Sequence, residues 1–182
     1  MNERNLDAIK YNNYILNQQE IKDKKIILKS KPLSLKLDIT ANCQLKCIMC
    51  LSENKRDVTL DFKYISKIIK LHGNELISVQ WMGGEPTTHP DFEKIISYTN
   101  SFGIMQTITT NGLLLKAELA EKLIKFNADI TISIDGSTKE LYESIRCGAN
   151  FETLVSNIEN LNKLRKKYNH TNSLAINHSP AN

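Results

Sequence analysis

The chain has 182 residues, of which 41% are hydrophobic and 24% are charged, a composition typical of a globular protein with a buried core. Its formal net charge of +4 comes from lysines scattered along the whole chain, which gives little support to nucleic-acid binding. The first residues lack the apolar segment of a signal peptide, and no apolar run is long enough to cross a bilayer. We therefore expect a cytoplasmic protein that does not enter a membrane.

The hydrophobic pattern predicts strands and helices in alternation. Residues 1–30 form a lead-in, in which we expect a helix within residues 1–20 and a short strand at residues 26–30. Residues 33–40 alternate leucine or isoleucine with other residues, which is the period of a strand. In chain order, the further predicted strands are residues 76–82, 104–110, 129–135 and, as a candidate fifth, 173–177; the predicted helices are residues 60–71, 91–102, 116–126, 138–146 and 152–167. Asp91 is the expected cap of the second of these helices.

This order of elements predicts a parallel sheet. Strands that alternate with helices at this spacing form right-handed βαβ units, in which the helices cover the sheet. No linker, repeat or low-complexity tract divides the chain. We therefore predict one α/β domain over residues 31–182.

Each of the first four predicted strands ends in a distinctive cluster of residues. The clusters are "CQLKCIMC" at residues 43–50, "GGEP" at 83–86, "TTNG" at 109–112 and "SIDG" at 133–136. Because parallel strands bring their carboxyl ends to the same edge of a sheet, the four clusters are expected to meet there. Any single cluster is also explained as an ordinary turn, but glutamate after paired glycines and grouped cysteines are not turn requirements.

The cysteine loop suggests metal or redox chemistry. It holds three of the four cysteines, and the remaining one, Cys147, lies almost a hundred residues away. In a reducing compartment grouped cysteines are more often ligands than disulfide partners. Structural zinc usually has four protein ligands, whereas soft thiolates can hold an iron-sulfur cluster that keeps one iron open to another ligand. Two alternatives remain: zinc completed by the distant His72 or His89, and cysteines packed in the core.

The segment "LDITANCQLKCIMC" resembles the signature of the radical S-adenosylmethionine (SAM) superfamily. That resemblance implies a partial parallel (βα) barrel and a [4Fe-4S] cluster bound by Cys43, Cys47 and Cys50. It also implies that the amino and carboxylate groups of SAM occupy the fourth iron, so no fourth cysteine is required. Met49 stands where the family often has an aromatic residue, and its polarizable side chain can still cover the cluster.

The later clusters resemble the same family in the same order. "WMGGEPTTHPDF" is similar to its GGE motif, in which backbone carbonyls and the glutamate meet the amino group of SAM. Ser133 and Asp135 would lie near the ribose and methionine portions of SAM. Arg146 would pair with the SAM carboxylate, the alternative being an exposed structural arginine. The resemblance thus assigns cofactor binding to Gly83, Gly84, Glu85, Asn111, Ser133, Asp135 and Arg146.

The resemblance also implies a reaction. An electron from a flavodoxin or ferredoxin enters the cluster, SAM is cleaved, and the 5'-deoxyadenosyl radical abstracts hydrogen from a substrate, as in an oxidoreductase. The motifs favour the branch of the family that modifies peptides or other natural products. The family barrel usually has six strands, so four or five predicted strands suggest a truncated or short form, incomplete at the C-terminus. The alternatives are a non-catalytic cluster and SAM module completed by a partner chain, and a zinc-stabilised interaction domain.

Overall fold

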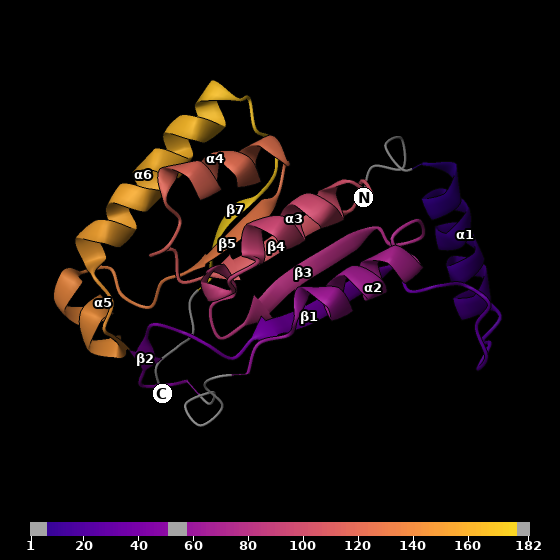
Figure 1. Ribbon diagram of the computed structural model, residues 1–182, viewed down its shortest axis with the longest axis horizontal. Helices are drawn as coiled ribbons and strands as arrows, with labels where there is room; N and C mark the ends of the chain where they lie inside the picture. Colours follow the sequence, from indigo (N-terminus) through magenta and orange to yellow (C-terminus); the bar gives the residue numbers. More distant parts are fainter. Residues whose placement is uncertain (1–6, 51–57, 178–182) are drawn as a thin grey trace.

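The computed structural model describes residues 7–50 and 58–177 of the chain, and within them a parallel sheet of five strands forms the centre of the fold. The strand order is β1-β3-β4-β5-β7, and every neighbouring pair is parallel (Figure 1). The strands are β1 (Ser34–Thr40), β3 (Ser78–Gly83), β4 (Met105–Thr110), β5 (Asp129–Ser133) and β7 (Leu174–Asn177). The predicted parallel α/β fold is thereby confirmed, including the candidate fifth strand.

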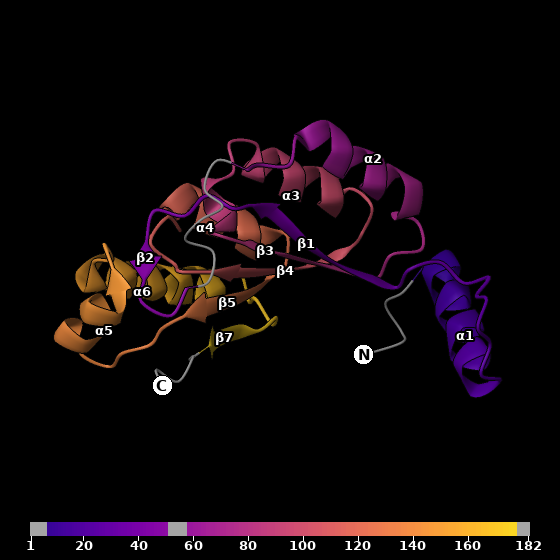
Figure 2. The same ribbon diagram turned by 90° about the horizontal axis from the view of Figure 1, so that it is seen from below.

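Helices cover this sheet. Figure 2 shows α2 and α3 on the same side of the sheet, and α4 and α6 contact each other further along it. The helices are α1 (Ala8–Lys22), α2 (Phe62–His72), α3 (Phe92–Asn100), α4 (Ala117–Lys125), α5 (Lys139–Ile145) and α6 (Phe151–Lys167), with a short 3-10 turn η2 (Pro86–Thr88) after β3. Among the described residues, no helix combines the length and apolar character needed to cross a membrane.

The core lies between the sheet and these helices. In β3 the alternate residues Val79 and Trp81 are fully buried, and they belong to the same cluster as Ile65 and Ile69 of α2. The indole Nε1 of Trp81 donates a hydrogen bond of 2.9 Å to Gln106 Oε1, so this buried polar group has a partner. Trp81 is therefore a core residue, as its position in an alternating strand indicates.

Helix α1 is fixed to the start of the sheet by one buried lysine. Its position beyond the first residues of β1 is clear in Figure 1. The Lys10 ammonium is almost fully buried and donates to three carbonyl oxygens, at 3.0 Å to Gly73, 2.7 Å to Leu76 and 2.9 Å to Phe102. The lead-in helix is thus anchored at the amino ends of the strands, away from the edge where the motifs meet.

The structure corrects two local expectations and adds one element. The predicted strand at residues 26–30 is absent, because Ile26 and Ile27 are 97% and 87% exposed and pair with no strand. Asp91 stands at the N-cap of α3, but its side chain makes no capping hydrogen bond. The sequence analysis also missed a second, two-stranded antiparallel sheet, in which β2 (Lys46–Cys47) pairs with β6 (Arg146–Cys147).

Candidate metal and cofactor site

The motifs at the carboxyl ends of the strands meet around one pocket of about 220 Å³. Of the residues predicted for metal or cofactor binding, its lining includes Cys43, Cys47, Cys50, Gly83, Gly84, Glu85, Asn111, Ser133 and Arg146. Leu45, Met49 and Met82 give the pocket an apolar part. Asp135, the remaining predicted residue, does not line this pocket.

The two glycines at the end of β3, Gly83 within the strand and Gly84 directly after it, allow the cysteine loop to begin next to that strand end. The Gly84 amide donates to Thr40 O at 2.7 Å, and the Glu85 amide donates to Asn42 O at 2.8 Å. A Cβ on Gly84 would lie only 2.4 Å from Asn42 O, while Gly83 has a φ of +123°. Both positions therefore require glycine, one for space and the other for backbone conformation. The paired glycines hold the residues directly before Cys43.

Glu85 connects the ends of β3 and β4 through its buried carboxylate. Oε1 accepts hydrogen bonds from the Thr87 hydroxyl at 2.6 Å and from the Thr110 hydroxyl at 2.7 Å. Oε2 accepts from the Asn111 amide at 2.6 Å. Hydrogen bonds to a charged acceptor are among the stronger ones in proteins, so this carboxylate fixes the two strand ends relative to each other.

Asn111 joins the "TTNG" segment to the cysteine loop. Its Oδ1 accepts a hydrogen bond from Gln44 Nε2 at 3.0 Å and one from the Leu113 amide at 3.1 Å. Its Nδ2 lies 3.9 Å from Cys43 Sγ, within the range of a hydrogen bond to sulfur. The side chain of Asn111 is therefore shared between a strand end and the first cysteine, and Gly112 completes the predicted turn with a φ of +80°.

None of the three cysteines forms a disulfide, and all three line the same pocket. Cys47 belongs to β2, and the Cys50 amide donates to Cys47 O at 3.0 Å, so the loop turns back on itself. Burial raises the pKa of the Cys47 thiol, while the nearby Arg146 opposes this shift and Cys43 adds to it. Cys43 and Cys47 are half-buried and Cys50 is exposed, which excludes the alternative that these cysteines are packed in the core.

The structure gives no support to the zinc alternative. Within residues 7–50 and 58–177, no group of three or more His, Cys, Asp or Glu side chains is arranged to hold a single metal ion. Both ring nitrogens of His89 are already engaged, with Nδ1 accepting from the Asp91 amide at 3.0 Å and Nε2 lying 2.8 Å from Leu60 O. Three soft thiols that line one pocket without converging on a single point fit a cluster of several irons better than they fit one ion.

Arg146 and Asp135 form a buried ion pair beside Cys47. The guanidinium Nη2 lies 2.5 Å from Asp135 Oδ2, with side-chain exposures of 10% and 0%, and Nη1 lies 3.9 Å from Cys47 Sγ. Arg146 is therefore not the exposed structural arginine that was the alternative reading. The assignment of Asp135 to SAM stays a prediction, and in the structure its carboxylate faces the arginine.

Several side chains that support the site escaped the sequence analysis. Gln44 and Thr110 make hydrogen bonds described above; they lie inside the clusters "CQLKCIMC" and "TTNG", but the sequence analysis gives neither of them a role. Asn157 of α6 donates from Nδ2 to Gly112 O at 2.8 Å and to Leu113 O at 3.1 Å, which fixes the turn after β4 from a distant helix. No local pattern signals such a contact, because it depends on how α6 packs.

The comparisons with known proteins agree with the fold and the motifs. The family model "Radical SAM superfamily" matches residues 37–179. The mycofactocin maturase MftC of Mycobacterium ulcerans is 34% identical over 134 residues, which cover 71% of this chain and 36% of that protein. The AdoMet-dependent heme synthase of Methanosarcina barkeri is 31% identical over 147 residues, covering 76% and 41% of the two chains.

Solved structures show the same architecture. SuiB of Streptococcus suis, in a crystal structure with the precursor peptide SuiA, matches with a TM-score of 0.68 and 25% identity, over 83% of this chain and 34% of SuiB. A structure of SuiB bound to S-adenosylmethionine matches equally well, at a TM-score of 0.68. This chain thus spans about a third to two fifths of the length of these relatives. With a family model that covers most of the chain and a parallel sheet of matching architecture, the chain belongs to the radical SAM superfamily.

Proposed function

We propose that this chain is the cofactor-binding portion of a radical SAM enzyme. In this proposal Cys43, Cys47 and Cys50 bind three irons of a [4Fe-4S] cluster. The bound cluster and SAM would supply the reductive chemistry by which the family resemblance implies hydrogen abstraction from a substrate. The observation that carries the proposal is the convergence of three cysteines outside any disulfide and the glycine–glutamate strand end on one pocket.

Each part of the pocket has a proposed task. The backbone of Gly83 and Gly84 presents carbonyl acceptors suited to the ammonium group of SAM. The carboxylate of Glu85 holds this backbone in place through the hydrogen bonds that it accepts from β4. Ser133 also lines the pocket and offers a hydroxyl to the polar groups of the cofactor. Leu45, Met49 and Met82 would limit the access of water to the reacting bond.

The substrate class that we propose is a peptide. Two relatives support this choice by name, since one is a maturase of mycofactocin and the other was crystallised with a precursor peptide. A ferredoxin or flavodoxin is the proposed electron donor, as the family resemblance implies. This chain spans only part of those relatives. We therefore also propose that further residues or a partner chain supply contacts to the substrate.

Anaerobic reconstitution tests the proposal directly. The chain is incubated with iron and sulfide, desalted, and assayed for bound iron, acid-labile sulfide and, after addition of SAM and dithionite, 5'-deoxyadenosine. We expect about four irons and four sulfides per chain and the release of 5'-deoxyadenosine. Cys50→Ser should lose the cluster, whereas Cys147→Ser, which changes an exposed cysteine outside the pocket, should keep it.

The outcomes separate the alternatives. A chain that takes up no cluster contradicts the proposal. A chain that binds the cluster and SAM but releases no 5'-deoxyadenosine is a binding module that requires additional residues for turnover. Stoichiometric zinc without labile sulfide after anaerobic purification would instead favour the zinc-stabilised domain.

A further inference from the structure

A buried pair of opposite charges lies beside one of the proposed cluster ligands. Asp135 follows β5, whereas Arg146 is the first residue of β6 and pairs in register with Cys47 across the small antiparallel sheet. The guanidinium therefore contacts both the Asp135 carboxylate, at 2.5 Å, and the sulfur of Cys47, at 3.9 Å. The Arg146 guanidinium thus lies between the buried Asp135 carboxylate and the Cys47 sulfur and contacts both.

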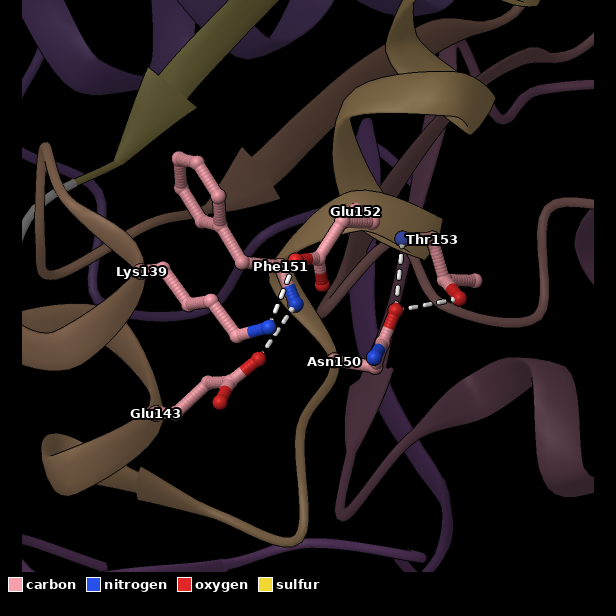
Figure 3. A network of polar contacts seen from close by, with 6 residues as sticks. All are labelled: Lys139, Glu143, Asn150, Phe151, Glu152 and Thr153. Atoms are coloured by element: carbon pink, nitrogen blue, oxygen red, sulfur yellow. Dashed lines mark hydrogen bonds and ion pairs between the residues drawn. The ribbon is translucent and has the colours of Figure 1, made fainter.

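The position of this arginine is well fixed. The segment that carries it is held between α5 and α6 by the contacts drawn in Figure 3. Glu143 of α5 accepts a hydrogen bond of 2.9 Å from the Phe151 amide at the start of α6, and Asn150 caps that helix by accepting from Thr153 N at 2.8 Å. On the other side, the Ile48 amide donates to Ile145 O at 3.0 Å, which ties the cysteine loop to the same segment.

Charges in this position act on a cluster more strongly than surface charges do. Arg146 supplies a positive charge and Asp135 a negative charge, and both side chains are buried. Buried charges interact across a low effective dielectric and are weakly screened by salt. Hydrogen bonds to the ligand sulfurs and local net charge are also the features through which proteins set the reduction potential of iron-sulfur clusters.

We infer that Arg146 and Asp135 together set the reduction potential of the cluster bound through Cys47. The inference rests on the proposed function, because it requires the cluster. The cluster gains one negative charge when it accepts an electron. The guanidinium beside the Cys47 sulfur favours that reduced form and raises the potential, whereas the Asp135 carboxylate offsets part of this cation and lowers it. The ion pair thus acts on the reduction potential through the charge beside the Cys47 sulfur, and this effect is separate from the proposed contact of Arg146 with SAM.

The two members of the pair therefore have opposite predicted effects. Removal of the cation in Arg146→Gln should shift the potential to more negative values. Removal of the anion in Asp135→Asn should shift it to more positive values, because the uncompensated guanidinium remains. A general loss of structure would not shift the reduction potentials of the two variants in opposite directions. Lys46→Gln is the matched control, since it removes one positive charge from the same small sheet at an exposed position.

The experiment is a redox titration of the reconstituted chain without SAM, so that cofactor binding does not enter the result. Dithionite supplies the single electron for the [4Fe-4S] couple, and the signal of the reduced cluster is followed by electron paramagnetic resonance. We expect the wild-type and Lys46→Gln proteins to have the same reduction potential. The potential of Arg146→Gln should be lower than theirs, and that of Asp135→Asn should be higher.

Each result decides a different question. If the wild-type chain binds no cluster, the proposed function fails before this inference is reached. If all variants bind the cluster at one potential, or if both substitutions shift it in the same direction, the inference is wrong. Should Arg146→Gln fail to bind the cluster, Asp135→Asn decides alone, because asparagine has nearly the same shape as aspartate. Loss of the cluster from both variants would assign the pair a purely structural role and would overturn the inference.

Discussion

Substitution of Gly84 by alanine should disturb the metal site without changing any proposed ligand. The new Cβ would lie 2.4 Å from Asn42 O and 2.6 Å from Ala41 O, two backbone atoms just before Cys43. Contacts shorter than 3.0 Å are essentially absent from real Cβ atoms, so Asn42 O must recede by at least 0.6 Å. A backbone oxygen cannot rotate away as a side chain can, and the start of the cysteine loop must therefore move.

The energetic cost follows from the hydrogen bonds at this contact. The Gly84 amide donates to Thr40 O and the Glu85 amide donates to Asn42 O, at 2.7 and 2.8 Å, and the displacement weakens both. A net loss near 1 kcal/mol for each bond, plus residual strain, gives a destabilisation of about 3 kcal/mol. We expect a smaller free energy of unfolding and a reduced iron and sulfide content after reconstitution.

A second glycine provides the control for this experiment. Gly103 has a φ of +61°, but a Cβ there would meet nothing within 4 Å. Gly103→Ala should cost about 1 kcal/mol from backbone conformation alone and leave the cluster content unchanged. Urea denaturation and iron and sulfide analysis measure the two quantities. If Gly84→Ala retains wild-type stability and a full cluster, then the close approach of β3 to the cysteine loop does not support the site.

Two further substitutions test the contacts that surround the site and the lead-in helix. Glu85→Gln places an amide where the carboxylate accepts a hydrogen bond from the Asn111 backbone. We expect the free energy of unfolding, measured by urea denaturation, to fall by about 2 to 3 kcal/mol. The exposed Glu93→Gln should lower it by less than about 0.5 kcal/mol. Lys10→Met keeps the apolar stem but removes three hydrogen bonds to carbonyl oxygens, so we expect the free energy of unfolding in urea to fall by about 3 kcal/mol. Lys22→Met, on the exposed face of the same helix, should leave this free energy nearly unchanged. Unchanged stability of either buried variant would show that its hydrogen bonds are replaced by water at no net cost.

The sequence predicted the sheet well because each strand has its own hydrophobic period and a distinctive end. The expected strand at residues 104–110 is observed as Met105–Thr110, for example. The failure at residues 26–30 has a physical cause. A run of apolar residues forms a strand only where a partner strand supplies hydrogen bonds and buries one face, and here Ile26 and Ile27 have neither.

The candidate site was predicted as a set of residues, but the roles of some residues could not be read from their motifs. The assignment of both glycines to the cofactor stays a prediction, and the structure adds a role that the motif does not reveal, because both glycines also contact the backbone that precedes Cys43. The contact of Glu85 with the SAM amino group also stays a prediction, and the structure adds that its carboxylate accepts hydrogen bonds from the chain itself. Sequence identifies which residues meet, but hydrogen-bond partners depend on three-dimensional packing.

The two half-buried cysteines of the pocket contact separate and distant parts of the chain. Asn111, at the end of β4, contacts the sulfur of Cys43, and Arg146, in β6, contacts that of Cys47. Both supports exist only after the parallel sheet has formed, so an isolated peptide with the cysteine loop would lack them. Metal binding to a site that is absent from the unfolded chain adds its free energy to folding. The cluster should therefore stabilise the whole sheet, and its loss and the unfolding of the sheet should occur together.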